Sequence, residues 1–101
     1  MFASRIGEML VASGQFSAAI ASGASTTTIK SGAGRLCRVS ITTAGTASFS
    51  VFDNTSGSGT LLYTSAAATS VGTVIDIQMP AQLGITVVNQ VSGPAFTVSF
   101  D

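Results

Sequence analysis

The fold is decided by a stretch of alternating side chains that reads Arg35-Leu36-Cys37-Arg38-Val39-Ser40-Ile41-Thr42. Cys37, Val39 and Ile41 alternate with polar neighbours, and this period of two is typical of a strand with one buried and one wet face. The same period returns in three later stretches, although Phe52 breaks it after the first of them. These stretches are residues 47–51, 75–79 and 96–100.

Shorter runs rich in β-branched and aromatic residues lie at 61–64 and 85–88, and a further strand is expected around Thr26 to Lys30. Turn residues separate these runs at 43–45, 53–59, 70–72, 79–84 and 89–94. Six or seven short strands with turns roughly every 8–15 residues predict an all-β fold. We therefore expect a single antiparallel β-sandwich or jelly-roll-like domain.

Residues 1–24 have a different pattern. Their apolar residues Phe2, Ile6, Met9 and Leu10 fall on one helical stripe, whereas glycines within the stretch weaken a helix. A short helix and an extended arm both remain open. The apolar run at 9–12 is broken by Ser13, Gly14 and Gln15, and is therefore a poor hydrophobic core for a signal peptide. The expected organisation is an N-terminal arm or short helix at 1–24 and a β-sandwich domain at 25–101.

Charge is scarce along the whole chain. Only 8% of the residues are charged, with a formal net charge of zero, against roughly 25% in an average soluble domain. The sequence instead contains 15 Ser and 13 Thr. A neutral surface of this kind tends to self-associate, which favours a protein that works within an assembly.

The same scarcity argues against two classes of partner. Four basic residues without net positive charge are too few for electrostatic nucleic-acid binding, and Lys30, Arg35 and Arg38 are interpreted as solvated strand residues rather than a phosphate site. No apolar stretch approaches the roughly 20 residues needed to cross a membrane. We expect neither nucleic acid nor membrane as a partner.

The residues for common catalytic and metal sites are missing. Without histidine, neither a Ser-His-Asp nor a Cys-His apparatus can be built, and the lone Cys37 is predicted to be buried. Asp53 is expected to open a turn through its own side chain. The loop at 53–59 fails the EF-hand pattern, because Gly57 falls at a ligand position. No enzyme activity, metal or cofactor is expected.

The succession of residues 35–45, 51–59, 71–76 and 79–87 resembles small structural proteins of tailed bacteriophage particles, most of all head decoration or cement proteins. The resemblance covers roughly the last two-thirds of the chain. It implies a homo-oligomeric sandwich, such as a trimer, on the outside of the virion. There it would bind the major capsid protein and reinforce the shell, after assembly in the host cytoplasm.

The candidate assembly contacts are four apolar side chains of the N-terminal segment: Phe2, Ile6, Leu10 and Phe16. Two interpretations of these side chains are open. In the first they would dock on a neighbouring subunit or the shell, and in the second they would cover one end of the domain's own core. One alternative function is a tail or fibre module that binds a host glycan through loops 53–59 and 89–94. The absence of Trp and the presence of only one Tyr make a sugar site less expected. A second alternative function is that of a tail-tube or head–tail connector component.

Overall fold

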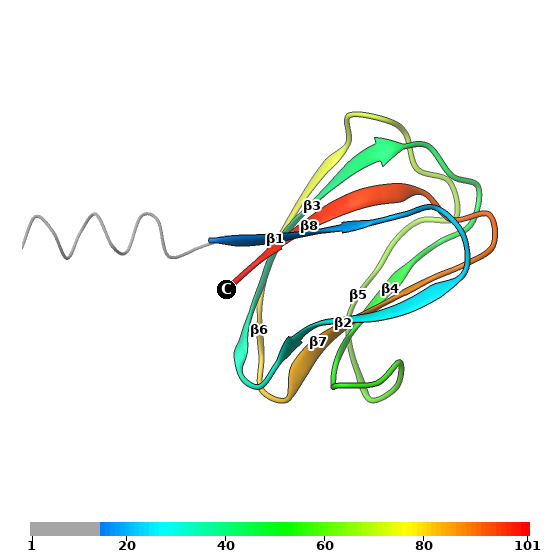
Figure 1. The fold of residues 1–101 in the computed structure, drawn as a ribbon. Helices are drawn as coiled ribbons and strands as arrows, with labels where there is room; N and C mark the ends of the chain where they lie inside the picture. Colours follow the sequence, from blue (N-terminus) through cyan, green and yellow to red (C-terminus); the bar gives the residue numbers. More distant parts are fainter. Residues whose placement is uncertain (1–14) are drawn as a thin grey trace, which may run out of the picture.

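The computed structural model describes residues 15–101, and these form eight strands and no helix. The strands make two antiparallel four-stranded sheets that pack face to face, as Figure 1 shows. The predicted all-β sandwich is confirmed. The strands are β1 (Phe16–Ile20), β2 (Ser25–Ser31), β3 (Gly34–Thr43), β4 (Ser50–Asp53), β5 (Thr60–Thr64), β6 (Val74–Ala81), β7 (Gly84–Asn89) and β8 (Ala95–Phe100).

The strand order identifies the sandwich as a jelly roll. One sheet has the order β1-β8-β3-β6 and the other β2-β7-β4-β5. The first strand therefore pairs with the last, the second with the seventh, the third with the sixth and the fourth with the fifth. This is the pairing of one long antiparallel hairpin that has been rolled into two layers.

The core lies between the sheets, and most of its residues are inward members of the alternating stretches. The rings of Phe49 and Phe96 stack at its centre, with centroids 4.1 Å apart. Most of the predicted inward residues are buried. Met79 is an exception, with 41% of its surface exposed, because β6 is an edge strand and Gln78 before it has a positive φ of 54°. The alternation therefore fails near the end of β6.

A β-bulge interrupts the stretch that decides the fold. The register of β3 shifts between Leu36 and Arg38 against both of its neighbours. One extra residue in a strand turns a side chain to the other face, and Leu36 and Cys37 are accordingly both buried although they are adjacent. The predicted burial of Cys37 is confirmed.

The predicted boundary between arm and sandwich at residue 25 needs correction. Phe16–Ile20 pair with β8 in continuous register, so the first strand of the sandwich lies within the stretch expected to be an arm. Ile20 is buried in the core. This strand was missed because its sequence FSAAI contains mainly small residues and little alternation. The expectation of an arm or helix for residues 1–14 lies outside the described residues.

Candidate functional site

In the jelly-roll order, successive connections between strands lie alternately at the two ends of the sandwich. The loop end consists of the β1–β2, β3–β4, β5–β6 and β7–β8 connections. The terminal end consists of the other three connections, together with Gln15 and Asp101. The loop end comprises residues 21–24, 44–49, 65–73 and 90–94.

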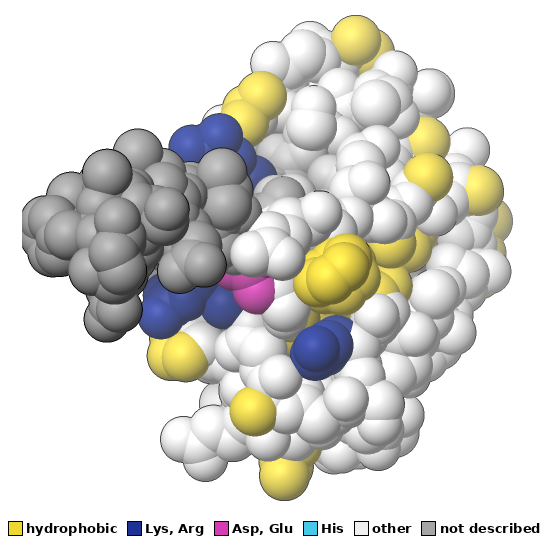
Figure 2. Space-filling view, turned by 60° about the vertical axis from the view of Figure 1, so that its left-hand side comes forward, with side chains coloured by type: hydrophobic (Ala, Val, Ile, Leu, Met, Phe, Trp, Pro, Cys, Tyr) yellow, Lys and Arg dark blue, Asp and Glu magenta, His cyan; other side chains and the backbone are white. Residues whose placement is uncertain are grey.

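The two ends differ in charge. None of the loop-end residues is charged. The charged residues of the described part lie within strands or at the terminal end, and Figure 2 shows Lys and Arg side chains on the face that it draws. They are Lys30, Arg35, Arg38, Asp53, Asp76 and Asp101. Among residues 15–101, the loop end therefore carries no charged residue.

Backbone hydrogen bonds tie three loops of the loop end together. The amides of Thr46 and Ala47 both donate to the carbonyl oxygen of Ser92, at 2.8 and 3.0 Å. The amide of Thr69 donates to the carbonyl of Gly45 at 3.1 Å, within an isolated antiparallel bridge. These contacts join the β3–β4 loop to both the β7–β8 and β5–β6 loops.

The fourth loop is held by a buried asparagine. The side-chain amide of Asn89 donates to the carbonyl oxygens of Ala21 and Pro94, at 3.0 and 2.8 Å. Its Oδ1 accepts a hydrogen bond from the amide of Gln90 at 3.0 Å. With 4% of its surface exposed, Asn89 satisfies main-chain groups that would otherwise be buried without partners. The loop end is therefore an ordered surface.

Apolar side chains project from this ordered, uncharged surface. Val71 in the β5–β6 loop and Val91 in the β7–β8 loop are 65% and 81% exposed. Exposed apolar residues that stand singly need no explanation. Here, however, they stand on a surface where no charge would have to be desolvated on contact. The loop end is the candidate interaction surface.

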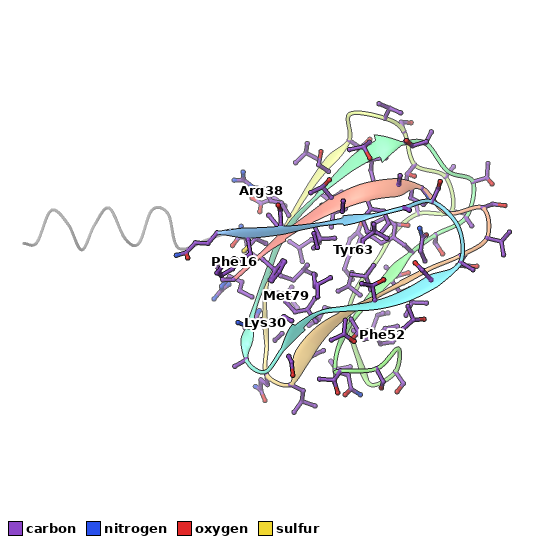
Figure 3. The ribbon with its side chains drawn as sticks, viewed as in Figure 1. Phe16, Lys30, Arg38, Phe52, Tyr63 and Met79 are labelled. Atoms are coloured by element: carbon purple, nitrogen blue, oxygen red, sulfur yellow. The ribbon has the colours of Figure 1, made fainter. Side chains whose placement is uncertain are left out.

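Of the four predicted assembly contacts, only Phe16 lies in the described residues. It begins β1 at the terminal end, where Figure 3 shows it. Its ring lies 5.8 Å from that of Phe100, and 54% of its surface is exposed. The neighbouring Gln15 amide donates to the Asp101 carboxylate at 2.9 Å. Phe2, Ile6 and Leu10 lie outside the described residues.

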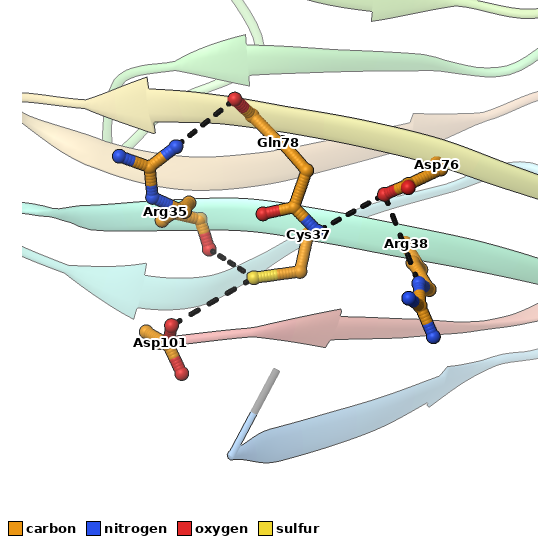
Figure 4. A network of polar contacts seen from close by, with 6 residues as sticks. All are labelled: Arg35, Cys37, Arg38, Asp76, Gln78 and Asp101. Atoms are coloured by element: carbon orange, nitrogen blue, oxygen red, sulfur yellow. Dashed lines mark hydrogen bonds and ion pairs between the residues drawn. The ribbon is translucent and has the colours of Figure 1, made fainter. Parts of the chain in front are cut away.

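The terminal end carries a polar network between β3 and β6, drawn in Figure 4. The Arg35 guanidinium donates to the Gln78 carbonyl at 3.0 Å. Arg38 forms an ion pair with Asp76 at 3.7 Å, and the Gln78 side chain also donates to Asp76 at 3.0 Å. Both arginines are thus engaged with the edge strand beside them.

The thiol of Cys37 lies next to this network, beside the Asp101 carboxylate. Its Sγ contacts the Arg35 carbonyl at 3.7 Å and the Asp101 carboxylate at 3.8 Å. Residues 15–101 contain no group of three or more His, Cys, Asp or Glu side chains that could hold a metal. The described surface has no pocket, and the described chain has no helix that could cross a membrane.

Asp53 makes a long-range contact that sequence reasoning missed. Its carboxylate accepts hydrogen bonds from three successive amides of the β6–β7 turn: Gln82 at 2.9 and 3.0 Å, Leu83 at 2.8 Å and Gly84 at 3.3 Å. The expectation that Asp53 opens its own turn is therefore wrong. The two segments meet because β4 and β7 are neighbours in the sheet, a pairing that no local pattern reveals.

The turn after Asp53 is held by the next residue instead. The side-chain amide of Asn54 donates to the Ser58 carbonyl at 2.9 Å, and its Oδ1 accepts from the Thr55 amide at 2.8 Å. Asparagine commonly stabilises turns through such local hydrogen bonds. Asp53 is thereby left to bind the β6–β7 turn.

We expect the Asp53 contact to make stability depend on pH in acid. The amides of Leu83 and Gln82 are the main cause that lowers the pKa of Asp53 from its ordinary value of 3.8; desolvation opposes them, and the Gly84 amide adds a smaller lowering. A carboxylate with a lowered folded-state pKa stabilises the fold above its unfolded value and loses that effect as pH falls through the folded one. The Asp53 contribution is therefore complete near neutral pH and lost below about pH 4.

Urea unfolding across pH measures this effect. Asp53→Asn is expected to unfold at lower urea than the wild type at neutral pH, and the two curves should converge in acid. Asp76→Asn is the control, because the ion pair with Arg38 and the hydrogen bond from Gln78 that it alters are both exposed and contribute little. A difference between wild type and Asp53→Asn that stays constant into acid would contradict the assignment.

By its strand order the chain is a jelly-roll β-sandwich. Comparison with known proteins adds no relative: no family model matches the chain, and no curated protein or solved structure matches it significantly.

Proposed function

We propose that the protein is a non-enzymatic structural component of a tailed-phage virion that decorates the capsid and reinforces its shell. The observation that supports this most is the uncharged, hydrogen-bonded loop end with Val71 and Val91 exposed on it. Such a surface can be buried against another protein without desolvating a charge. Because its loops are already tied together, little conformational entropy is lost on binding.

The proposal accounts for the unusual composition. A decoration protein binds the assembled shell in preference to its free subunits, so many copies stabilise the assembly by mass action. The binding partner is then the major capsid protein, and the protein resides in the virion after assembly in the host cytoplasm. The abundant hydroxyl side chains keep the free protein in solution, while few charges oppose close packing on the particle.

A glycan-binding role receives less support from the surface. Sugar sites commonly offer an aromatic face, and Tyr63 is the chain's only tyrosine. Its ring lies 5.8 Å from the core residue Phe49, and Figure 3 shows it between the sheets. Tyr63 therefore does not offer a free platform for a sugar ring. The experiment described below therefore also measures binding to host glycans.

The test uses capsid shells of a tailed phage whose genome carries the gene for this protein. The shells are assembled without the protein, and its binding to them is then measured by co-sedimentation. We expect the double variant Val71→Lys/Val91→Lys to bind at least about tenfold more weakly, because two charges would be buried without partners. The control Ser56→Lys/Ser58→Lys places the same charges on the terminal end, where both serines are exposed. It should bind like the wild type.

A second arm of this experiment tests the N-terminal segment. The truncation has to end at residue 14, since removal of residues 16–20 would delete β1. Loss of binding by the chain that starts at Gln15 would assign shell contact to the segment containing Phe2, Ile6 and Leu10. Unchanged binding would remove that segment from the mechanism. Binding to a glycan array without binding to shells would replace the decoration role with adhesion.

A further inference from the structure

The described strands leave four sheet edges, and three of them carry features that oppose strand addition. β6 contains Pro80 and the positive-φ residue Gln78, whose carbonyl is bound by Arg35. β2 has an irregular register between Thr28 and Lys30 and carries the charge of Lys30. β5 pairs with β4 through another register shift. Proline, charge and bulges are the means by which proteins protect sheet edges.

The fourth edge, β1, has none of these features. Its five residues pair with β8 in unbroken register, from Phe16 opposite Phe100 to Ile20 opposite Phe96. The strand reads Phe-Ser-Ala-Ala-Ile, without charge or proline. An edge strand presents unpaired amide and carbonyl groups along its outer side, which can pair with another strand. Among the described edges, β1 is the one left open to such pairing.

We propose that β1 is a strand-addition site and that its occupant is β1 of a second copy of this chain. The two strands run antiparallel about a two-fold axis at Ala18, so that the two four-stranded sheets continue into each other. A two-fold contact uses the same patch on both copies and closes on itself. This inference is independent of the proposed virion role, because it uses neither Val71 nor Val91.

The side chains of β1 fit this self-pairing. A two-fold at Ala18 sets Phe16 opposite the partner's Ile20, and Ser17 opposite the partner's Ala19. Apolar cross-strand pairs stabilise antiparallel sheets. Phe16 is 54% exposed, so the pairing would place its ring against the edge of the partner's sheet and cover apolar surface that is open in the single chain.

Charge does not oppose a second copy as the occupant. In the antiparallel arrangement, the terminal end of one copy, with Asp101 beside Gln15, faces residues 21–24 of the other. Those residues are Ala-Ser-Gly-Ala and carry no charge. Like charges do not meet across the axis, so electrostatic repulsion does not oppose the contact.

The test measures the mass of the full chain by light scattering on a sizing column. The wild type is expected at twice the chain mass of 10.1 kDa. Ala19→Lys places a charge at an exposed position of the β1 edge and should halve that mass. Thr27→Lys puts the same side chain at an exposed position of β2 and should leave the dimer intact. Leu10→Asp should also leave it intact.

The inference would be overturned by a monomeric wild type at about 0.1 mM, by an odd-numbered oligomer such as a trimer, or by an unchanged mass for Ala19→Lys. Loss of the dimer in Leu10→Asp alone would likewise transfer the contact to the N-terminal segment. Hydrogen exchange of the wild type decides the matter if Ala19→Lys fails to fold. Under the proposal, β1 amides exchange faster as the protein is diluted; exchange that is independent of concentration would reject it.

Discussion

Replacement of Phe49 by alanine is expected to lower the free energy of unfolding by about 3–5 kcal/mol. Phe49 is fully buried, and its ring stacks on Phe96 at 4.1 Å with Tyr63 at 5.8 Å on another side. Loss of the ring removes its transfer free energy and leaves a cavity between the sheets. Native domains have only about 5–15 kcal/mol of stability in total, so this single change consumes a large part of it.

The cavity cannot close easily, because the backbone of Phe49 is anchored. Its amide donates to the Ser65 hydroxyl at 3.0 Å, and its carbonyl accepts from the Ser65 amide at 2.9 Å. When the surroundings relax little, the cost of a large-to-small change lies at the upper part of its range. Phe49 thus couples the core to the base of the β5–β6 loop.

Urea unfolding of the full chain gives the measurement. The control is Leu61→Ala on β5, where 48% of the side chain is exposed and the expected loss is about 1 kcal/mol or less. The slope of the free energy against urea should be equal in wild type and both variants. A loss for Phe49→Ala no greater than that of Leu61→Ala would contradict the position of the core.

Gly45→Ala is expected to be the most damaging small substitution at the loop end, with a loss of about 3 kcal/mol. A Cβ at this position would lie 2.6 Å from the Gly93 carbonyl carbon and 2.7 Å from the Pro94 Cα, and closer still to the Pro94 nitrogen. These are main-chain atoms, which cannot move aside as a side chain would. On its other side, Gly45 accepts the hydrogen bond from Thr69.

Thermal unfolding measures this effect, and a fall in Tm of more than about 10 °C is expected for a domain of this size. Gly57→Ala is the matched control, since a Cβ there would meet side-chain methyl groups of Val88 and Thr26 at 3.0 and 3.4 Å. Such groups can shift by a few tenths of an ångström. Equal Tm values for the two variants would show that the loops do not approach as closely as described.

The loop end links stability to the proposed function. Gly45 holds three loops together, and Val71 and Val91 project from two of them. If Gly45→Ala separates these loops, binding to capsid shells should weaken even though neither valine has changed. The buried Asn89 supports the same surface from the β1–β2 side. The architecture of the loops therefore matters to the surface as much as the exposed side chains do.

Some features were predictable from the sequence because they depend on neighbours along the chain. Period-two alternation in 35–42 and 96–100 predicted β3 and β8, since a half-buried strand requires it. The solitary Cys37 was predicted to be buried from its apolar surroundings, and the structure confirms it. Lack of charge is a property of composition. These are local or additive quantities, and the printed sequence contains them in full.

Other features depend on contacts between residues far apart, so only the tertiary structure decided them. Phe16–Ile20 became a strand because β8 offers it an edge, although its own pattern is weak. Asp53 binds amides 29–31 positions away, because strand order brings β4 beside β7. The uncharged loop end exists because the jelly roll gathers four separate connections at one place. The sequence by itself determined the strands with alternating side chains and the scarcity of charge. The pairing of the strands decided where charge is absent, because only folding brings the separate loops together into one surface.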